Sequence, residues 1–295
     1  MESIQVVTAD GVVLSGLHVP YRSEGGHDRG LGFVLCHGFA GSTRKPAVRR
    51  IIARLARHGG VLAADFRGHG RSKDGILDVA SRRLRSLRFE SGPHSGLGHG
   101  PSGGRSSVGD AEVLDVDAVV ALARRLGYAR VATVGFSMGG AVVVRHAAAA
   151  PTATGVAPVE RVDAVVSVSA PSRWYIRDTR PMRRVHWLLE SRSGRLVSVA
   201  VLRTRIGQRW VDVPESPAEV AGRVAPTPLL VVHGDRDLFF GVEHGRALAA
   251  AAGPGAELWE VAGFGHAEGA VTPELVDRIA GWASGRGRPA GTMRP

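Results

Sequence analysis

The sequence contains little cysteine, little lysine and no long apolar run, and each shortage narrows the classes of protein it can encode. Cys36 is the one cysteine among 295 residues, so no disulfide can form within the chain, which fits a reducing compartment. No stretch reaches the roughly 18 apolar residues that a membrane-spanning helix needs. The N-terminus, MESIQVVTADG, lacks the basic start and apolar run of a signal peptide. We therefore expect a cytoplasmic protein.

Lysine occurs only at Lys45 and Lys73, so the formal net charge of +11 comes from arginines spread singly and in pairs along the chain. A balance this basic can indicate nucleic acid, a membrane surface or an acidic substrate. No basic stretch of helical pattern is interleaved with aromatic side chains that could stack on bases, however. We attribute the charge to the arginine-rich composition and expect no specific nucleic-acid partner.

Apolar runs alternate with amphipathic stretches over most of the chain. Residues 3–8 and 12–19 alternate apolar and polar around Asp10-Gly11, which predicts a β-hairpin. The later apolar runs lack alternation, as strands buried on both faces do. We expect strands at GFVLCHG, VLAADF, VATV, DAVVSVS, PLLVVHG and 257–261, and helices over 46–58, 110–127 (N-cap Asp110), 138–150, 243–252 and 273–284. This pattern predicts the α/β class: a doubly wound, mostly parallel sheet that begins with an antiparallel hairpin, in a single domain over 1–284.

Two segments interrupt this alternation. Residues 73–108 include the low-complexity run SGPHSGLGHGPSGGRSS, and we expect a flexible Gly/Arg-rich insertion there. Residues 171–227 gather four aromatic side chains, Trp174, Tyr175, Trp187 and Trp210. A long excursion between two core strands is more often a lid or a substrate-binding insert than a plain loop. We predict a mostly helical cap over 171–227 and a disordered tail over 285–295.

Part of the insertion, LDVASRRLRSLRF, places four apolar residues on one helical face, Leu77, Ala80, Leu84 and Leu87. A basic amphipathic helix of this kind could rest on an anionic membrane. We favour a tolerated, disordered insertion instead. Under the membrane hypothesis, deleting 76–103 would abolish binding to anionic vesicles.

A candidate nucleophile is Ser137, in the sequence GFSMG. The G-x-S-x-G pattern alone is weak in a chain with 40 glycines, and GPSGG around Ser102 matches it too. Ser137 follows the predicted strand VATV and opens a predicted helix, which is the strand-turn-helix context of a nucleophile elbow. Ser102 lies in the low-complexity run with neither element beside it. We predict that Ser137 is the nucleophile.

A serine hydroxyl is a poor nucleophile until a neighbouring base takes its proton. His266, in GFGHAE, lies between the last predicted strand and the last predicted helix. His233 lies inside a predicted strand and His244 at a helix start, so both are weaker candidates. We predict that His266 is the base for Ser137.

The acid that orients this histidine is expected after the preceding strand. LLVVHGDRD offers Asp235 and Asp237 there. We favour Asp237, because it lies further into the loop, where a carboxylate can turn toward His266, whereas Asp235 is placed to bond backbone N–H groups of the turn. The chain order Ser137, Asp237, His266 is the one expected for this architecture.

Acyl transfer also requires hydrogen-bond donors for the developing oxyanion. The backbone N–H of Met138, at the start of the predicted helix, is one candidate. The backbone N–H of Phe39, in the loop CHGFAGS after the first buried strand, is the other. His37 and Gly38 are expected to shape that loop, with a structural role for His37 weighed equally against a functional one.

Together these segments resemble the α/β-hydrolase superfamily, and most closely its esterase, acylglycerol-lipase and serine-aminopeptidase-like group. The matching motifs cover most of 30–284 in order: HGF at 37–39, DFRGHGRS at 65–72, GFSMGG at 135–140, HGDRD at 233–237 and GFGHAE at 263–268. The resemblance implies a hydrolase without cofactor or metal that acts through an acyl-enzyme intermediate. It also implies that the cap supplies the substrate pocket, for which we name Trp174, Tyr175 and Trp187. The long, Gly-rich segment 73–108 departs from the family, where a short connection is the rule.

We expect hydrolysis of a carboxylic ester or thioester of a small to medium, apolar acyl substrate. Peptide hydrolysis and carbon–carbon bond hydrolysis could use the same three residues. A non-catalytic binding protein of this fold would be expected to have lost one of them, and this chain retains Ser137, Asp237 and His266. The sequence indicates no particular oligomeric state.

Overall fold

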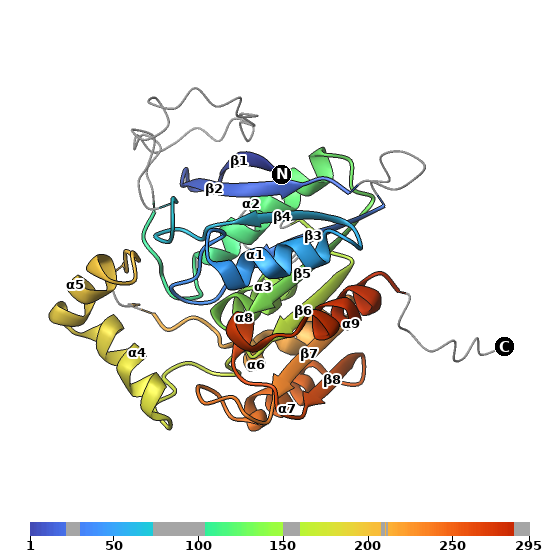
Figure 1. The fold of residues 1–295 in the computed structure, drawn as a ribbon. Coiled ribbons are helices and arrows are strands. Elements are labelled where there is room, and N and C mark those ends of the chain that lie inside the picture. The colour runs from blue at the N-terminus through green and yellow to red at the C-terminus, as the bar shows by residue number, and fades with distance from the viewer. Residues whose placement is uncertain (22–29, 73–103, 150–159, 208–209, 211, 286–295) are drawn as a thin grey trace.

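The computed structural model describes residues 1–21, 30–72, 104–149, 160–207, 210 and 212–285, and the fold is given for these ranges (Figure 1). The strands form one sheet in the order β1-β2-β4-β3-β5-β6-β7-β8. The hairpin pairs antiparallel, β2 pairs antiparallel with β4, and the remaining neighbours are parallel. The strands are β1 (Glu2–Val7), β2 (Val13–Val19), β3 (Leu31–Cys36), β4 (Gly60–Ala64), β5 (Arg130–Phe136), β6 (Ala164–Val168), β7 (Leu229–Gly234) and β8 (Ala256–Val261). The predicted α/β class and mostly parallel sheet are confirmed.

Helices cover both faces of this sheet, as a parallel sheet requires. One face is covered by α2 (Glu112–Arg125), α3 (Met138–Ala149) and α7 (Val242–Ala252). The other is covered by α1 (Pro46–Leu55) and α9 (Pro273–Ala283). Two apolar clusters result, one on each face, and the carboxyl ends of the parallel strands are left at a common edge.

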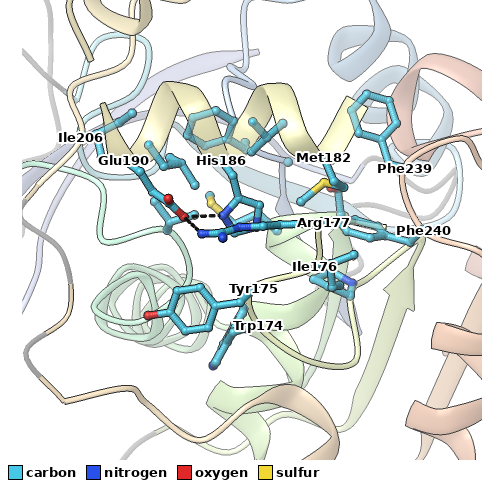
Figure 2. A pocket seen from close by; sticks show the side chains of 18 of the residues that line it. Trp174, Tyr175, Ile176, Arg177, Met182, His186, Glu190, Ile206, Phe239 and Phe240 are labelled. Atoms are coloured by element: carbon cyan, nitrogen blue, oxygen red, sulfur yellow. Dashed lines mark hydrogen bonds and ion pairs between the residues drawn. The ribbon is translucent and has the colours of Figure 1, made fainter. Parts of the chain in front are cut away.

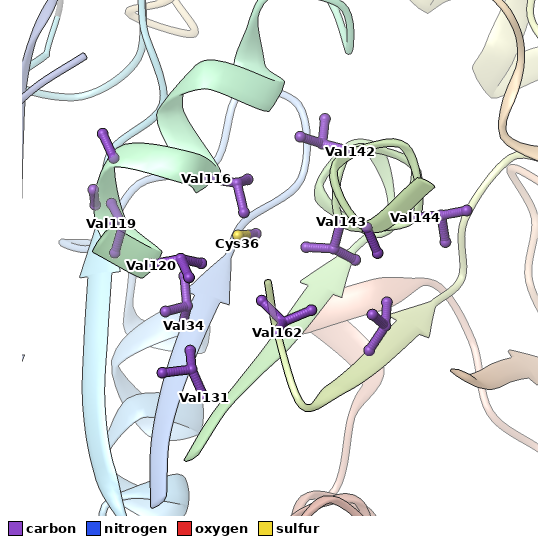
Figure 3. Close-up of a cluster of buried hydrophobic side chains, with 14 of the residues drawn as sticks. Val34, Cys36, Val116, Val119, Val120, Val131, Val142, Val143, Val144 and Val162 are labelled. Carbon is purple, nitrogen blue, oxygen red and sulfur yellow. The ribbon is translucent and has the colours of Figure 1, made fainter. Parts of the chain in front are cut away.

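Valine dominates the first of these clusters (Figure 3). Val34 and Val131 of the sheet lie beneath Val116 and Val120 of α2, and all four are at most 1% exposed. Cys36 lies in the same layer, where burial raises the pKa of its thiol well above the ordinary value. Because only the thiolate is an effective nucleophile, Cys36 acts as an apolar packing residue and not as a reactive thiol.

The predicted boundaries of two helices were wrong. Helix α1 ends at Leu55, and residues 56–58 form a turn. Helix α2 begins at Glu112, with Ala111 and not Asp110 at its N-cap position and no side-chain cap. The Asp110 carboxylate instead accepts a hydrogen bond from Arg145 of α3 at 3.0 Å. A partner distant in sequence therefore displaced the local capping interaction.

The segment predicted as a cap contains two structurally different parts. Helices α4 (Arg180–Glu190) and α5 (Arg192–Ala200) form a pair that stands away from the sheet (Figure 1). Helices α6 (Pro217–Val220) and η2 (Ala221–Val224) pack against α3 and α7, with Val220, Ala221 and Val224 buried. The second part therefore belongs to the core of the fold.

Several predictions fall on residues that the structure does not describe. These are most of the insertion (73–103), which includes its basic stretch and Ser102, and residues 286–295 of the tail. None of the helices in the described ranges combines the length and the apolar composition that a bilayer-spanning segment needs.

A buried ion pair fixes the loop that follows β4. The Arg67 guanidinium lies 2.7 Å from the Asp115 carboxylate on α2 and 2.7 Å from Asp10 in the hairpin turn. The Arg67 and Asp115 side chains are 4% and 2% exposed, and Asp115 also accepts the backbone N–H of Arg67 at 2.8 Å. The contacts of Arg67 with Asp10 and Asp115 therefore join the hairpin, the DFRGHGRS loop and α2.

Replacing Asp115 with alanine leaves the buried Arg67 charge paired with Asp10 alone among the carboxylates of the described residues. Removing one partner of a buried pair costs about 3–5 kcal/mol, so we expect Asp115→Ala to lower the free energy of unfolding, measured in urea, by about that amount. The exposed Glu215–Arg223 pair, at 2.6 Å, provides the control. Glu215→Ala should change the same quantity by less than about 1 kcal/mol, and equal losses in the two variants would contradict the assignment.

His69, in the same loop, couples stability to pH. Its ring is fully buried, and Nδ1 lies 3.0 Å from the Arg67 carbonyl oxygen. Burial, together with the neighbouring His37, lowers the pKa of His69 to about 4. An unfolded chain, whose histidines keep a pKa near 6.5, binds a proton between about pH 6.5 and 4 that the folded protein does not bind.

We therefore expect the free energy of unfolding to fall as the pH is lowered from about 6.5 to 4, by up to about 1.4 kcal/mol per pH unit from this group. His69→Phe removes the titration and should give a shallower slope in urea unfolding over this window. Burial also lowers the pKa of His233 and His244, which contribute to the remaining slope. Identical slopes in the wild-type protein and the variant would show that His69 does not titrate as described.

Candidate active site

Ser137 occupies the turn between β5 and α3 with a positive φ of 51°. A non-glycine residue in this conformation costs about 1–3 kcal/mol and persists where the surrounding packing enforces it. A Cβ on Gly135 would collide with the backbone of Gly139, and a Cβ on Gly139 would collide with the Cys36 carbonyl at the end of β3. The two glycines thus let α3 approach the sheet closely, and the turn presents Ser137 at the carboxyl edge.

His266 and Asp237 complete a hydrogen-bonded chain with this serine. His266 Nε2 lies 3.0 Å from Ser137 Oγ, and His266 Nδ1 lies 2.8 Å from Asp237 Oδ2. His266 precedes the short helix α8 (Ala267–Ala270), in the loop after β8, and Asp237 follows β7. With its Nδ1–H donated to Asp237, the ring keeps Nε2 free to accept the serine proton.

The carboxylate of Asp237 is held in place by the backbone. Its side chain is fully buried, and Oδ1 accepts the N–H groups of Phe239 at 2.8 Å and Phe240 at 3.1 Å. Phe239 also stacks on the His266 ring, with centroids 4.3 Å apart. Asp235, the other aspartate of the motif, accepts the Gly263 N–H at 2.6 Å and so shapes the turn.

The two other candidate histidines have different partners. His233 Nε2 lies 3.0 Å from the Phe240 carbonyl oxygen and 3.7 Å from Asp237 Oδ2. His244 Nδ1 lies 2.8 Å from Ser172 Oγ. Among the described residues, no group of three or more histidine, cysteine or carboxylate side chains could hold a metal ion.

The two proposed oxyanion donors also stand at this edge. Met138 is the first residue of α3, and Phe39 follows β3. Within the described ranges, neither backbone N–H donates to a hydrogen-bond acceptor. His37 has a structural role, because its Nε2 accepts the Phe66 N–H at 3.0 Å and its Nδ1 therefore donates to the Gly38 carbonyl at 2.8 Å.

One residue of the site was missed by the sequence reasoning. Glu268, two residues after His266, accepts the backbone N–H of Gly38 through Oε1 at 2.6 Å. It is part of the quoted motif GFGHAE, but its partner lies 230 positions away in the sequence. No local pattern signals a contact of that kind.

Ser137 and His266 lie in the lining of a cavity of about 480 Å³. Figure 2 shows other side chains of its wall. Its apolar lining includes Trp174, Tyr175, Ile176, Met182, Leu189 and Ile206. A polar group lies in the same wall, where the Glu190 carboxylate is 2.5 Å from Arg177 and 2.8 Å from His186.

The structure brings Trp174 and Tyr175 to this cavity but places Trp187 elsewhere. Helix α4 turns Met182, Val185 and Leu189 toward the cavity. Positions three and four residues apart share one face of a helix, and position 187 falls on another face. Trp187 is accordingly 48% exposed. Trp210, which the sequence also marked as a cap aromatic, does line the cavity.

The chain belongs to the alpha/beta hydrolase fold family, whose model matches residues 33–196. The resemblance inferred from the five motifs is thus confirmed. A search of curated proteins found no matching relative.

Solved structures share the fold at low sequence identity. The Pyrococcus furiosus esterase Pf2001 is 21% identical, with a TM-score of 0.63 over 96% of this chain and 90% of that chain. The esterase RhEst1 from Rhodococcus sp. ECU1013 is 20% identical, with a TM-score of 0.58 over 96% and 99%. DcsB, solved in complex with its substrate analogue, is 16% identical, with a TM-score of 0.65 over 97% and 98%. At these identities the likeness establishes the fold alone.

The contacts of the two aspartates predict different consequences for the same substitution. Asp237→Asn preserves size but no longer fixes the His266 tautomer, so we expect the rate at which a fluorophosphonate labels Ser137 to fall by about 10³- to 10⁴-fold. Asp235→Asn is the matched control and should label within a few-fold of the wild-type rate. An equal loss in both variants would mean that Asp237 acts through the shape of the loop and not through the histidine.

Proposed function

We propose that this protein is a serine hydrolase that cleaves the carboxylic ester or thioester bond of a small to medium, apolar acyl substrate. The observation that carries the proposal is the uninterrupted hydrogen-bonded chain from Ser137 through His266 to Asp237. It lies beside the backbone N–H groups of Phe39 and Met138, which have no acceptor among the described residues, and at the mouth of a cavity. Membership of the alpha/beta hydrolase fold family supports hydrolysis as the reaction class.

Each step of the proposed reaction uses a group already in place. Ser137 Oγ attacks the carbonyl carbon while its proton passes to His266 Nε2, 3.0 Å away. The carbonyl oxygen becomes negative and accepts the N–H groups of Phe39 and Met138. His266 then protonates the leaving group, and the acyl group stays on Ser137. Water, deprotonated by the same nitrogen, then attacks the acyl-enzyme. His266 returns this proton to Ser137 Oγ as the acid leaves, which restores the starting enzyme.

The cavity supports an apolar acyl group of limited size. Its volume of about 480 Å³ and its aliphatic and aromatic walls favour burial of a hydrocarbon chain. The Pf2001 and RhEst1 structures are those of esterases, which is consistent with this substrate class. Peptide hydrolysis, carbon–carbon bond hydrolysis and non-catalytic binding are the alternatives that the experiment must separate.

We expect a fluorophosphonate probe to label the wild-type protein and not Ser137→Ala. In a panel of chromogenic esters of increasing acyl length, turnover should peak at a short to medium chain, because longer chains exceed the cavity. Ser137→Ala should reduce turnover by at least about 10⁴-fold.

Matched substrates with one acyl group identify the bond that is cleaved. Esters and thioesters should react faster than the corresponding amide, and a faster amide would instead favour a peptidase. No labelling and no turnover by well-folded wild-type protein would contradict the proposal, and ligand-induced thermal stabilisation without turnover would then favour a binding protein.

A further inference from the structure

Glu268 connects two loops that the proposed reaction uses for different purposes. It lies in α8, two residues after His266, and it also lines the cavity. Its Oε1 accepts the backbone N–H of Gly38 at 2.6 Å, in the loop after β3 that carries the Phe39 donor. The loop of the base and the loop of the oxyanion donor are therefore joined by a side chain that takes no part in proton transfer.

The geometry at Gly38 shows what this hydrogen bond can control. Two planar peptide units meet at the Gly38 Cα. The first contains the Gly38 N–H, which donates to Glu268. The second contains the Gly38 carbonyl, which accepts from His37 Nδ1 at 2.8 Å and from the Gly41 N–H at 2.9 Å. The Phe39 N–H belongs to this second unit and points away from the same carbonyl, because the peptide is trans.

Because residue 38 is a glycine, hydrogen bonds are needed to fix the peptide units on both of its sides. A side chain at position 38 has little room, because a Cβ there would lie 3.1 Å from the Ser137 Cβ. Glycine is also the residue whose backbone dihedrals are least restricted, so sterics alone do not fix the two peptide units. The contacts of Glu268, of His37 and of the Gly41 N–H supply the restraint that a Cβ would otherwise give.

We propose that Glu268 is a positioning residue that sets the direction of the Phe39 N–H toward the developing oxyanion. This inference rests on the proposed function. This orienting effect depends on the acceptor oxygen and on the length of the side chain, and not on its negative charge. A carboxylate beside a site that accumulates negative charge opposes the transition state through its charge, so an uncharged acceptor of equal length should serve as well or better.

Three substitutions of Glu268 separate reach from charge. Glu268→Gln keeps the length and an acceptor oxygen but removes the charge. Glu268→Asp keeps the charge but withdraws the carboxylate by one methylene, and Glu268→Ala removes the acceptor. Glu274→Ala, an exposed glutamate in the first turn of α9, is the control.

The measurements are kcat and KM on the ester that the wild-type protein hydrolyses best, the rate of Ser137 labelling by a fluorophosphonate, and the melting temperature. We expect kcat and the labelling rate to fall by about 10- to 100-fold in Glu268→Ala and Glu268→Asp, with KM changed by less than about twofold, since a misdirected donor weakens the transition state more than the bound substrate. Glu268→Gln and Glu274→Ala should remain within about threefold of wild type.

Hydrogen exchange of the peptide that contains residues 37–40 gives a readout that needs no turnover. Exchange should accelerate in Glu268→Ala and not in Glu268→Gln, because the first variant leaves the Gly38 N–H unbonded. Three results would overturn the inference. The first is a Glu268→Ala variant with wild-type kcat and unchanged exchange. The second is a loss of kcat in Glu268→Gln while Glu268→Asp keeps its kcat, and the third is a change in KM without a change in kcat. Labelling of wild-type Ser137 tests the proposed function separately, so a labelled wild-type protein with an equally fast Glu268→Ala variant rejects the role of Glu268 alone.

Discussion

The close approach of α3 to the end of β3 is the constraint on which the site depends. Gly139 lies so near the Cys36 and His37 carbonyl groups that no side chain fits between the helix and the strand. This contact forces the sharp turn at Ser137 and brings the first N–H of α3 beside the loop that carries Phe39. Ser137 and the backbone N–H groups of Phe39 and Met138 are thus placed by backbone packing, which is the form of preorganisation that electrostatic catalysis needs.

The remaining groups reach this point through the topology of the sheet. The carboxyl ends of parallel strands meet at one edge, so loops that are far apart in sequence become neighbours there. Ser137 and His266 are 129 positions apart, and Gly38 and Glu268 are 230 apart. The buried Arg67–Asp115 pair acts on the next loop of the same edge, which holds Phe66 against His37. The loops of the candidate site are therefore held by contacts between residues that lie behind the site residues.

Much of this arrangement could be predicted from the sequence, because strand, turn and helix are local patterns. The context of GFSMG favoured Ser137, which lies 3.0 Å from His266, and the distance into the loop favoured Asp237, which lies 2.8 Å from the same histidine. The features that were wrongly predicted or missed depend on contacts between residues that are far apart in the sequence. Asp110 bonds Arg145 and does not cap α2, and Glu268 accepts the backbone N–H of Gly38. Whether Trp187 faces the cavity depends on the rotational orientation of α4. The number of aromatic residues in a segment gives no information on that orientation.

The buried cysteine has a practical consequence for work on the cap helices. Cys36 is the one cysteine of the chain, it is 4% exposed, and burial suppresses its ionisation. The native protein therefore offers thiol reagents almost no target. A cysteine introduced on an exposed position of α5, such as Leu196, which is 72% exposed, would be the sole reactive thiol. A fluorophore attached there would report on the position of α4 and α5 relative to the sheet, in a protein that otherwise keeps its natural sequence.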